Sequence, residues 1–225
     1  MRDEQNKEEH VTEENRMLWK EVDTTKPWVV FDMEETLLGL LDDPTDTLCA
    51  FFNREGVQNW LTSDKSHLVV LRPGANELLA DLGRDYNIAL LSTADTHIVN
   101  SVMEANHDFA RLFCLASGKD GIDNEYYEKE IPPPESLPRL KLRPNDAAKH
   151  PLRIKSNSPK VLVDDTDNEL WHDGNLWDLS NVGFVKVTRS IPDIKNDRTL
   201  FSIESPIRAA MAQLIARNIP LTPVS

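Results

Sequence analysis

The segment Trp28-Val29-Val30-Phe31-Asp32-Met33-Glu34-Glu35-Thr36 joins four consecutive apolar residues to a group of acids and a threonine. A short, continuous apolar run of this kind is typical of a strand that is buried on both faces of a sheet. Similar runs follow at residues 88–91 (IALL) and 161–163 (VLV), and residues 183–187 (GFVKV) form a fourth candidate strand. The sequence therefore predicts a sheet built from buried strands.

Helical patterns separate and follow these strands. Apolar residues recur at helical spacing in three segments. The first follows Arg72-Pro73-Gly74 and contains Leu78, Leu79 and Leu82; the second follows a cap at Asp95 or Thr96 and contains Ile98, Val99, Val102 and Met103. In the third, Ser205 is the expected N-cap and Pro206 the expected first helical residue, and the apolar residues are Ile207, Met211, Leu214 and Ile215. Buried strands that alternate with helices predict an α/β fold, with a mostly parallel sheet and helices on both faces.

Polar residues follow three of the predicted strands directly. Residues 32–36 (DMEET) come after the first, residues 92–95 (STAD) after the second and residues 164–167 (DDTD) after the third. One acid at a strand end is usually a helix cap or a turn residue. Parallel packing brings the carboxyl ends of strands to one edge, where ligands of such sheets bind. Three groups in this arrangement therefore indicate a shared site of carboxylates and a hydroxyl.

The order and spacing of these groups resemble the haloacid dehalogenase (HAD) superfamily, whose motifs are an Asp-x-Asp-x-Thr loop, a Ser or Thr, a Lys and a terminal acidic pair. Within it, the sequence is most similar to the small CTD phosphatases, also called NLI-interacting-factor-like phosphatases. The resemblance is carried by residues 32–37 (DMEETL), 71–74 (LRPG), 90–94 (LLSTA) and 161–165 (VLVDD). It spans about residues 27–218 and implies a HAD-like, Rossmann-related phosphatase domain over residues 26–219.

The resemblance implies a specific chemistry for the acids. Asp32 is the nucleophile, which attacks phosphorus and forms an aspartyl-phosphate that water later hydrolyses. A carboxylate can attack a phosphate dianion only when their repulsion is neutralised, and the family uses Mg²⁺ for this purpose. The implied metal ligands are the second oxygen of Asp32, the backbone carbonyl of Glu34, and either Asp164 or Asp165.

A hydroxyl and a lysine complete the implied site by binding the transferred phosphoryl group. Thr93 matches the family's hydroxyl because of its place relative to Ala94, whereas Ser92 is interpreted as a packed strand residue. Lys160 is excluded by reach, because it enters its strand about 13 Å from the active edge. Lys149 lies 15 residues before Asp164, close to the family's interval, and is the expected lysine.

Glu34 is the departure from the family pattern. The family places its general acid/base, an aspartate, two residues after the nucleophile. Glutamate performs the same proton transfer, but its carboxyl group lies one methylene further from the backbone, and a misplacement near 1 Å can cost about 10²-fold in rate. Three outcomes stay open: a fully active enzyme, a slow enzyme, or a phosphate-binding relative without turnover.

The gaps between the motifs bear on the substrate. Residues 37–91 contain a helix-like stretch that ends near Gly56, and residues 95–148 contain a proline-dense segment, so neither gap predicts a large cap domain. An open site favours a large phosphorylated substrate, such as a phosphoserine or phosphothreonine side chain of a protein. The alternatives are a small-molecule or nucleic-acid-end phosphatase of the same superfamily, and a non-catalytic HAD-fold binding module.

Composition bounds the remaining properties of the 225-residue chain. Its net charge of −13 argues against nucleic acid as a partner, because affinity for phosphate backbones comes from Lys and Arg.

The two ends of the sequence and its cysteines bear on location. Residues 1–25 are expected to form a polar arm and residues 220–225 a short tail, with no signal peptide or membrane span expected. Cys49 and Cys114 match no metal or redox spacing and are interpreted as buried thiols. The expected location is the cytoplasm.

Overall fold

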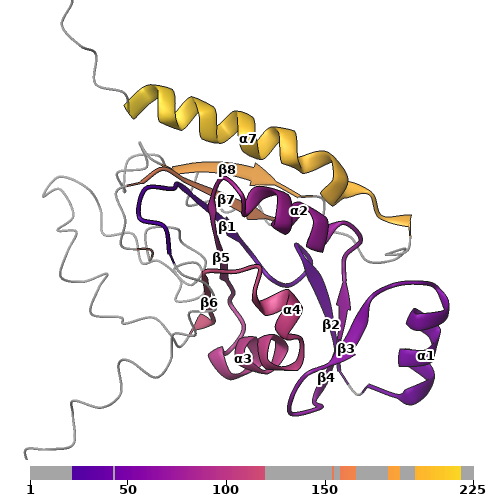
Figure 1. Cartoon of the computed structure of the whole chain (residues 1–225). Helices are drawn as coiled ribbons and strands as arrows, with labels where there is room; N and C mark the ends of the chain where they lie inside the picture. The colour runs from indigo at the N-terminus through magenta and orange to yellow at the C-terminus, as the bar shows by residue number, and fades with distance from the viewer. Residues whose placement is uncertain are drawn as a thin grey trace, which may run out of the picture.

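A computed structural model of the protein describes residues 22–42, 44–119, 154, 158–165, 182–187 and 196–218 (Figure 1). The elements in chain order are β1 (Trp28–Phe31), β2 (Leu38–Asp42), α1 (Asp46–Arg54), β3 (Asn59–Leu61), β4 (His67–Leu71), α2 (Ala75–Leu82), β5 (Asn87–Leu91), α3 (Thr96–Ala105), α4 (His107–Ala110), β6 (Leu115–Ser117), β7 (Lys160–Asp164), β8 (Val182–Lys186) and α7 (Thr199–Asn218).

The main sheet contains all four predicted strands and one more. Its order is β6-β5-β1-β7-β8, and each neighbouring pair is parallel. The additional strand, β6, has only three residues, too few for the sequence pattern to identify. The predicted α/β fold with a mostly parallel sheet is confirmed.

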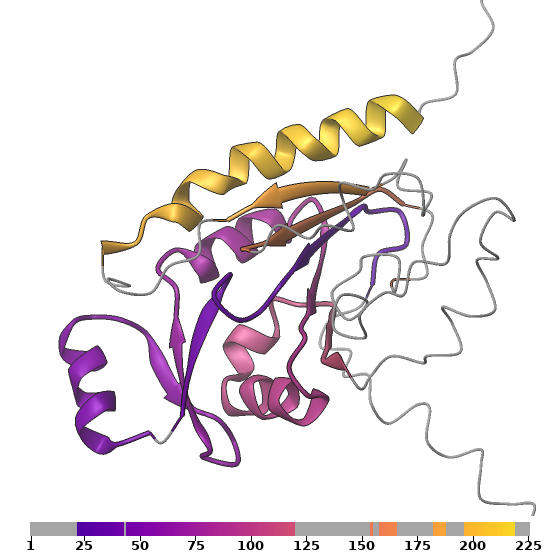
Figure 2. The same cartoon turned by 180° about the vertical axis from the view of Figure 1, so that it is seen from behind.

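The two faces of this sheet are covered differently. One face carries Val29, Phe31 and their neighbours in a core that includes residues of α2, α3, α4 and α7. The views from the front and from behind both place α7 along β7 and β8 (Figures 1 and 2), and α7 contacts both strands. The opposite face carries Trp28 and Val30 in a second cluster with Ile154. No described helix contributes to that cluster, so helical cover is confirmed for one face only.

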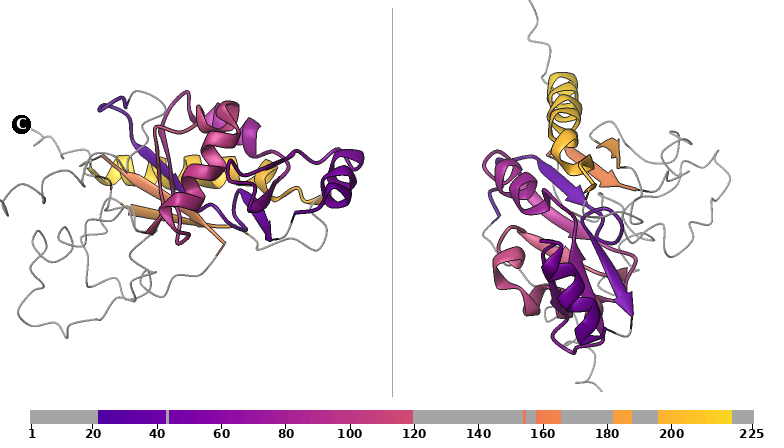
Figure 3. Two further views of the ribbon diagram at one scale, coloured as in Figure 1. Left: turned by 90° about the horizontal axis from the view of Figure 1, so that it is seen from below. Right: turned by 90° about the vertical axis from the view of Figure 1, so that its right-hand side faces the viewer.

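Residues 38–71 form a small insert between β1 and α2. Its strands make an antiparallel sheet of order β2-β4-β3, and Val57, Leu68 and Val70 form its own core with α1. The insert projects from one end of the main sheet (Figure 3). The Trp60 indole donates to the Val102 carbonyl (3.3 Å), which fastens the insert to α3. The helix-like stretch before Gly56 is confirmed as α1, whereas the antiparallel sheet is not among the sequence predictions.

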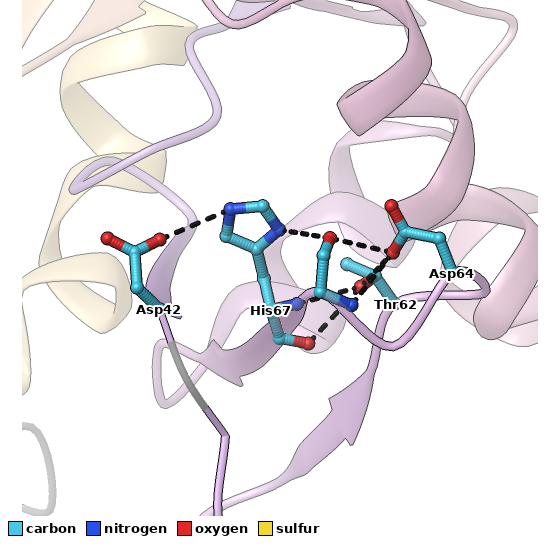
Figure 4. A network of polar contacts seen from close by, with 5 residues as sticks. Asp42, Thr62, Asp64 and His67 are labelled. Carbon is cyan, nitrogen blue, oxygen red and sulfur yellow. Dashed lines mark hydrogen bonds and ion pairs between the residues drawn. The ribbon is translucent and has the colours of Figure 1, made fainter.

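A polar network closes the β3–β4 turn of the insert (Figure 4). The Asp64 carboxylate accepts hydrogen bonds from the Thr62 hydroxyl (2.6 Å) and from the Ser66 amide and hydroxyl (3.0 and 2.8 Å), and these bonds lower the pKa of Asp64 to about 2. The His67 ring lies 2.6 Å from Ser66 Oγ and 3.2 Å from Asp42 Oδ1. The network therefore ties the turn to the end of β2.

The start of the last helix differs from the sequence prediction. Helix α7 begins at Thr199, so Ser205 and Pro206 lie inside it instead of at its N-terminus. The Asp197 carboxylate accepts a hydrogen bond from the Thr199 amide (2.8 Å) and occupies the capping role expected of Ser205. Burial of Ile203 and Ile207 on either side of Pro206 favours continuing the helix past the proline. Met211 and Leu214 are buried as predicted, but Ile215 is exposed.

The remaining expectations concern the chain ends, the membrane and the cysteines. Contacts begin before Pro27, because Asn87 Nδ2 donates to the Asp23 carbonyl (2.7 Å) and Val22 packs on the second cluster. In the described part of the chain, no helix combines the length and the apolar character needed to cross a membrane. Cys114 is buried and its thiol donates to Asn87 Oδ1 (3.7 Å), whereas Cys49 is only partly buried, and neither cysteine forms a disulfide with a described residue. Residues 1–21 and 219–225 lie outside the described residues.

Candidate active site

The direction in which successive strands are added to the main sheet reverses between β1 and β7. Strands β5 and β6 follow β1 on one side, whereas β7 and β8 continue on the other. Ligands of open parallel sheets bind beyond the carboxyl ends of the strands at such a switch point. Phe31 pairs with Val163, so the next residues of the two strands, Asp32 and Asp164, emerge side by side at that edge.

Three carboxylates converge at this switch point. Asp32, Asp164 and Asp165 each offer an oxygen, and these oxygens all lie within 4.8 Å of one another. The three residues are almost fully shielded from solvent, with exposures of 2%, 1% and 7%. Three like charges at this distance are stable together only when a proton or a cation offsets their repulsion. The sequence predicted that these acids meet at one edge of the sheet, and their mutual distance confirms that prediction.

Thr36 connects the acids of the two strands. Its buried hydroxyl accepts a hydrogen bond from the Asp165 amide (3.0 Å), and its proton can reach either Asp32 Oδ2 (3.5 Å) or Asp165 Oδ1 (3.4 Å). One hydroxyl proton can serve only one of the two carboxylates at a time. The sequence motif contained Thr36, but its role as a bridge was not predicted.

Asp32 begins a tight turn that leads into the insert. The Leu37 and Leu38 amides both donate to the Met33 carbonyl (3.0 and 3.1 Å), and the Glu35 amide donates to the Leu38 carbonyl (2.7 Å). Glu35 adopts a left-handed conformation with φ of 61°, which is uncommon for a residue other than glycine. The Glu34 side chain is exposed at this turn. We call residues 33–38 the motif turn.

A buried arginine, Arg72, binds the backbone of the motif turn. The Arg72 guanidinium donates to the carbonyls of Glu35 (2.9 Å) and Thr36 (3.2 Å) and forms an ion pair with Asp197. Burial alone would raise the pKa of Asp197, but hydrogen bonds from Arg72 and Thr199 outweigh it and lower the pKa. Arg72 thus links the turn to Asp197, two residues before α7 begins, a contact that sequence reasoning did not find.

The loop after β5 carries the predicted hydroxyl. Thr93 lies two residues beyond β5, the neighbour of β1, and is partly exposed at the same sheet edge as Asp32. Ser92 is buried and its hydroxyl accepts from the Ala94 amide (3.0 Å), as expected of a packed residue. The structure brings Thr93 to the predicted edge but does not test its role.

The segment after β6 holds this loop in place. The Lys119 amide donates to the Ala94 carbonyl (2.9 Å), and its ammonium group pairs with Asp95 (2.5 Å). A side-chain carbon at Gly118 would lie only 2.5 Å from the Ala94 carbonyl oxygen, so the two backbones pack in direct contact. Gly118 therefore permits the close approach that fixes the loop.

Two sequence predictions about lysine have different outcomes. Lys160 lies at the first residue of β7, at the opposite end of the strand from Asp164, as expected. Its Nζ donates to the Ser158 carbonyl (3.1 Å), and burial lowers its pKa. Lys149, the expected phosphate-binding lysine, lies outside the described residues.

The acid cluster fits a magnesium ion in chemistry and in size. Mg²⁺ prefers carboxylate and carbonyl oxygens at about 2.0–2.1 Å in octahedral geometry, so two of its ligand atoms lie at most about 4.2 Å apart. The carboxylate oxygens of the cluster, all within 4.8 Å of one another, are close to this spacing. Asp32 with Asp164, Asp165 or both would hold the ion.

Comparisons with known proteins give distant likenesses. One similar solved structure is Fcp1, an essential RNA polymerase II CTD phosphatase, with TM-score 0.43, 18% identity, and coverage of 87% of this chain and 52% of that chain. Another is fission yeast Fcp1, an RNA polymerase II CTD phosphatase, in a variant bound to beryllium fluoride, with TM-score 0.41, 16% identity, and coverage of 87% and 53%. The chain spans about half the length of each. No protein-family model and no curated protein matches the sequence.

Proposed function

We propose that the protein is a Mg²⁺-dependent phosphatase of the HAD type, which hydrolyses a phosphomonoester through an aspartyl-phosphate on Asp32. One observation carries this proposal: three buried carboxylates from two neighbouring parallel strands meet at the switch point of the sheet. An acid cluster in that position suits phosphoryl transfer, because the reaction needs an oxygen nucleophile beside a site for a divalent cation.

The proposed reaction has two steps on Asp32. In the first, a carboxylate oxygen of Asp32 attacks phosphorus, and the bond from phosphorus to the substrate oxygen breaks while Glu34 gives that oxygen a proton. In the second, Glu34 removes a proton from water, which attacks the phosphoryl group and releases inorganic phosphate and free Asp32. When bound, Mg²⁺ supplies the positive charge that lets two anions approach.

The residues around Asp32 have supporting roles in this proposal. Thr36 accepts from the Asp165 amide and donates its hydroxyl proton to the carboxylate of either Asp32 or Asp165, one at a time. Arg72 fixes the motif turn by donating to the carbonyls of Glu35 and Thr36. Thr93 and Lys149 are proposed to bind the phosphoryl oxygens, and the Glu34 carbonyl to complete the metal ligands.

Hydrolysis of an aryl phosphate such as p-nitrophenyl phosphate tests the proposed activity. The wild-type chain is expected to release p-nitrophenol with Mg²⁺ present, to lose activity in EDTA, and to regain it when excess Mg²⁺ is added. At least one of Asp164→Asn and Asp165→Asn should raise the Mg²⁺ concentration needed for half-maximal activity by about 10-fold or more, because a charged ligand is lost. Activity that persists in EDTA would contradict a metal-dependent mechanism.

Glu34→Asp tests whether the longer side chain limits turnover. We expect kcat to rise by up to about 10²-fold with KM nearly unchanged, because the shorter side chain places the carboxyl group where the family has it. Glu35→Asp is the matched control, since it makes the same change one residue away. An unchanged or lower kcat in Glu34→Asp would show that Glu34 is already well placed.

The same variant separates enzyme from binding module. Glu34 is the feature that supports a non-catalytic module. Its side chain is exposed and is one methylene longer than the aspartate that the HAD family has at this position. A wild-type chain that binds phosphate and Mg²⁺ but never turns over, with activity gained in Glu34→Asp, would favour that second function.

A further inference from the structure

A lysine, Lys186, lies beside the acid cluster on the next strand of the main sheet. It is the last residue of β8, and its register partner on β7 is Asp164. The Val187 amide donates to the Asp164 carbonyl (2.8 Å), so the two strands stay paired up to the carboxyl edge. Neighbouring strands lie about 4.8 Å apart, and this spacing sets the backbone distance between the lysine and the acid.

The pleat of the two strands places both side chains on the same face of the sheet. Val163 and Val185, the residues directly before Asp164 and Lys186, belong to the core on the α7 side. Successive side chains of a strand alternate between the faces, so Asp164 and Lys186 both lie on the opposite face. The residues two positions before each of them belong to the cluster on that opposite face, as this alternation requires: Leu162 and Phe184.

The two side chains differ in exposure. Asp164 is 1% exposed, whereas Lys186 is an exposed residue at the end of its strand. A lysine can lay its apolar stem along neighbouring groups while its ammonium group stays at the surface. From the same face of the adjacent strand, the ammonium group of Lys186 can therefore reach the surface above the buried acids.

The charge of the acid cluster is not balanced by Mg²⁺ alone. Asp32, Asp164 and Asp165 carry three negative charges when all are ionised, and their oxygens lie within 4.8 Å of one another. A bound Mg²⁺ offsets two of these charges, and the metal-free protein lacks even that compensation. A lysine beside Asp164 supplies one positive charge in both states.

We propose that Lys186 is a counter-ion of the acid cluster, which offsets the repulsion among the carboxylates when no metal is bound and lowers their affinity for Mg²⁺. The inference rests on the proposed function and extends it to the control of metal loading. Both effects have one cause, because a positive charge beside Asp164 attracts the carboxylates and repels the divalent ion. Lys186 acts without being a metal ligand, since an ammonium group has no acceptor atom.

Lys186→Met tests both effects, because methionine keeps most of the apolar stem and removes the charge. The Kd for Mg²⁺, measured by isothermal titration calorimetry at low salt, is expected to fall by about 5-fold or more, as for a unit charge and a divalent ion several ångströms apart in water. The melting temperature in EDTA is expected to fall by about 2 °C or more. Added salt should shrink the difference in Kd, because it screens exposed charges.

Three further variants separate the charge from other effects. Lys186→Arg conserves the charge and should keep the wild-type Kd and melting temperature. Lys65→Met, at an exposed lysine of the β3–β4 turn, is the matched control for the loss of one positive charge and should also change neither. In an Asp164→Asn background, Lys186→Met should lower the melting temperature in EDTA much less, because its partner is already neutral.

The signs of the two effects make the test decisive. A structural defect in Lys186→Met would weaken Mg²⁺ binding together with the fold, whereas the loss of a counter-ion tightens Mg²⁺ binding while it weakens the metal-free fold. A Kd that is unchanged or higher in this variant, or a melting temperature in EDTA that does not fall, would overturn the inference while an active wild-type chain left the proposed function standing. Both expected effects in a chain that hydrolyses no p-nitrophenyl phosphate would instead contradict the proposed catalysis alone. A wild-type chain without measurable Mg²⁺ binding would contradict both.

Discussion

Asp32→Asn is expected to lower the hydrolysis of p-nitrophenyl phosphate by at least about 10³-fold while the chain stays folded. An amide oxygen cannot attack phosphorus in place of the carboxylate, and losses of this size accompany removal of a covalent nucleophile. The substitution keeps the size and shape of a side chain that is 98% buried. Steady-state kinetics with saturating Mg²⁺ measure the effect.

The Asp32→Asn substitution is expected not to lower the stability of the folded state. Three carboxylate oxygens within 4.8 Å repel one another, so removing one charge is expected to maintain or raise the melting temperature in EDTA. Mg²⁺ should raise that temperature less in the variant than in the wild type, because a ligand charge is lost. Asp108→Asn, at an exposed acid on α4, is the matched control. More than about a tenth of the activity left in Asp32→Asn would exclude this residue as the nucleophile.

Arg72→Met is expected to lower the free energy of unfolding by about 3–5 kcal/mol, as when one partner of a buried ion pair is removed. Met keeps the apolar stem, but Asp197 loses its partner, and the carbonyls of Glu35 and Thr36 lose their donor. Urea denaturation followed by circular dichroism measures the change. Arg84→Met, in the exposed pair with Asp81, should cost less than about 1 kcal/mol.

The pH dependence of stability gives this prediction a second readout. The pKa of Asp197 is lower in the folded chain than its ordinary value of 3.8, so its stabilisation is present above that value and is lost as the pH falls through the folded-state pKa. Asp197→Asn should weaken the loss of stability in that acid range. In a double-mutant cycle, Arg72→Met should cost much less when Asp197 is already Asn. Additive effects would contradict the coupling of this pair.

The sequence predicted the main sheet because buried parallel strands have a local signature. The apolar runs at residues 28–31, 88–91 and 161–163 lie within β1, β5 and β7, and acids follow two of them directly. Once the sheet is parallel, its carboxyl edge is fixed, and the meeting of Asp32, Asp164 and Asp165 follows from strand order. The apolar pattern and the order of the strands therefore made the central part of the candidate site predictable from the sequence.

Features that depend on distant contacts were missed. The start of α7 was placed at Ser205 because Ser-Pro is a strong local capping signal, yet Asp197 caps the helix while it pairs with Arg72, 125 residues away. Nothing local marks that pair. Strands β2 and β3 were missed because they are only partly buried and their apolar pattern is weak. Strand β4 (HLVVL) has the same buried apolar run as the main-sheet strands, but it was not interpreted as a strand.

A crystal of the chain soaked with Mg²⁺ and beryllofluoride, which mimics an acyl-phosphate, tests the central claim most directly. The account predicts electron density for beryllofluoride bonded to a carboxylate oxygen of Asp32, and for Mg²⁺ between Asp32 and the 164–165 pair. Thr93 should then contact a fluorine atom. Beryllofluoride bound at any other residue, or an unmodified Asp32 at saturating concentrations of both ions, would contradict it.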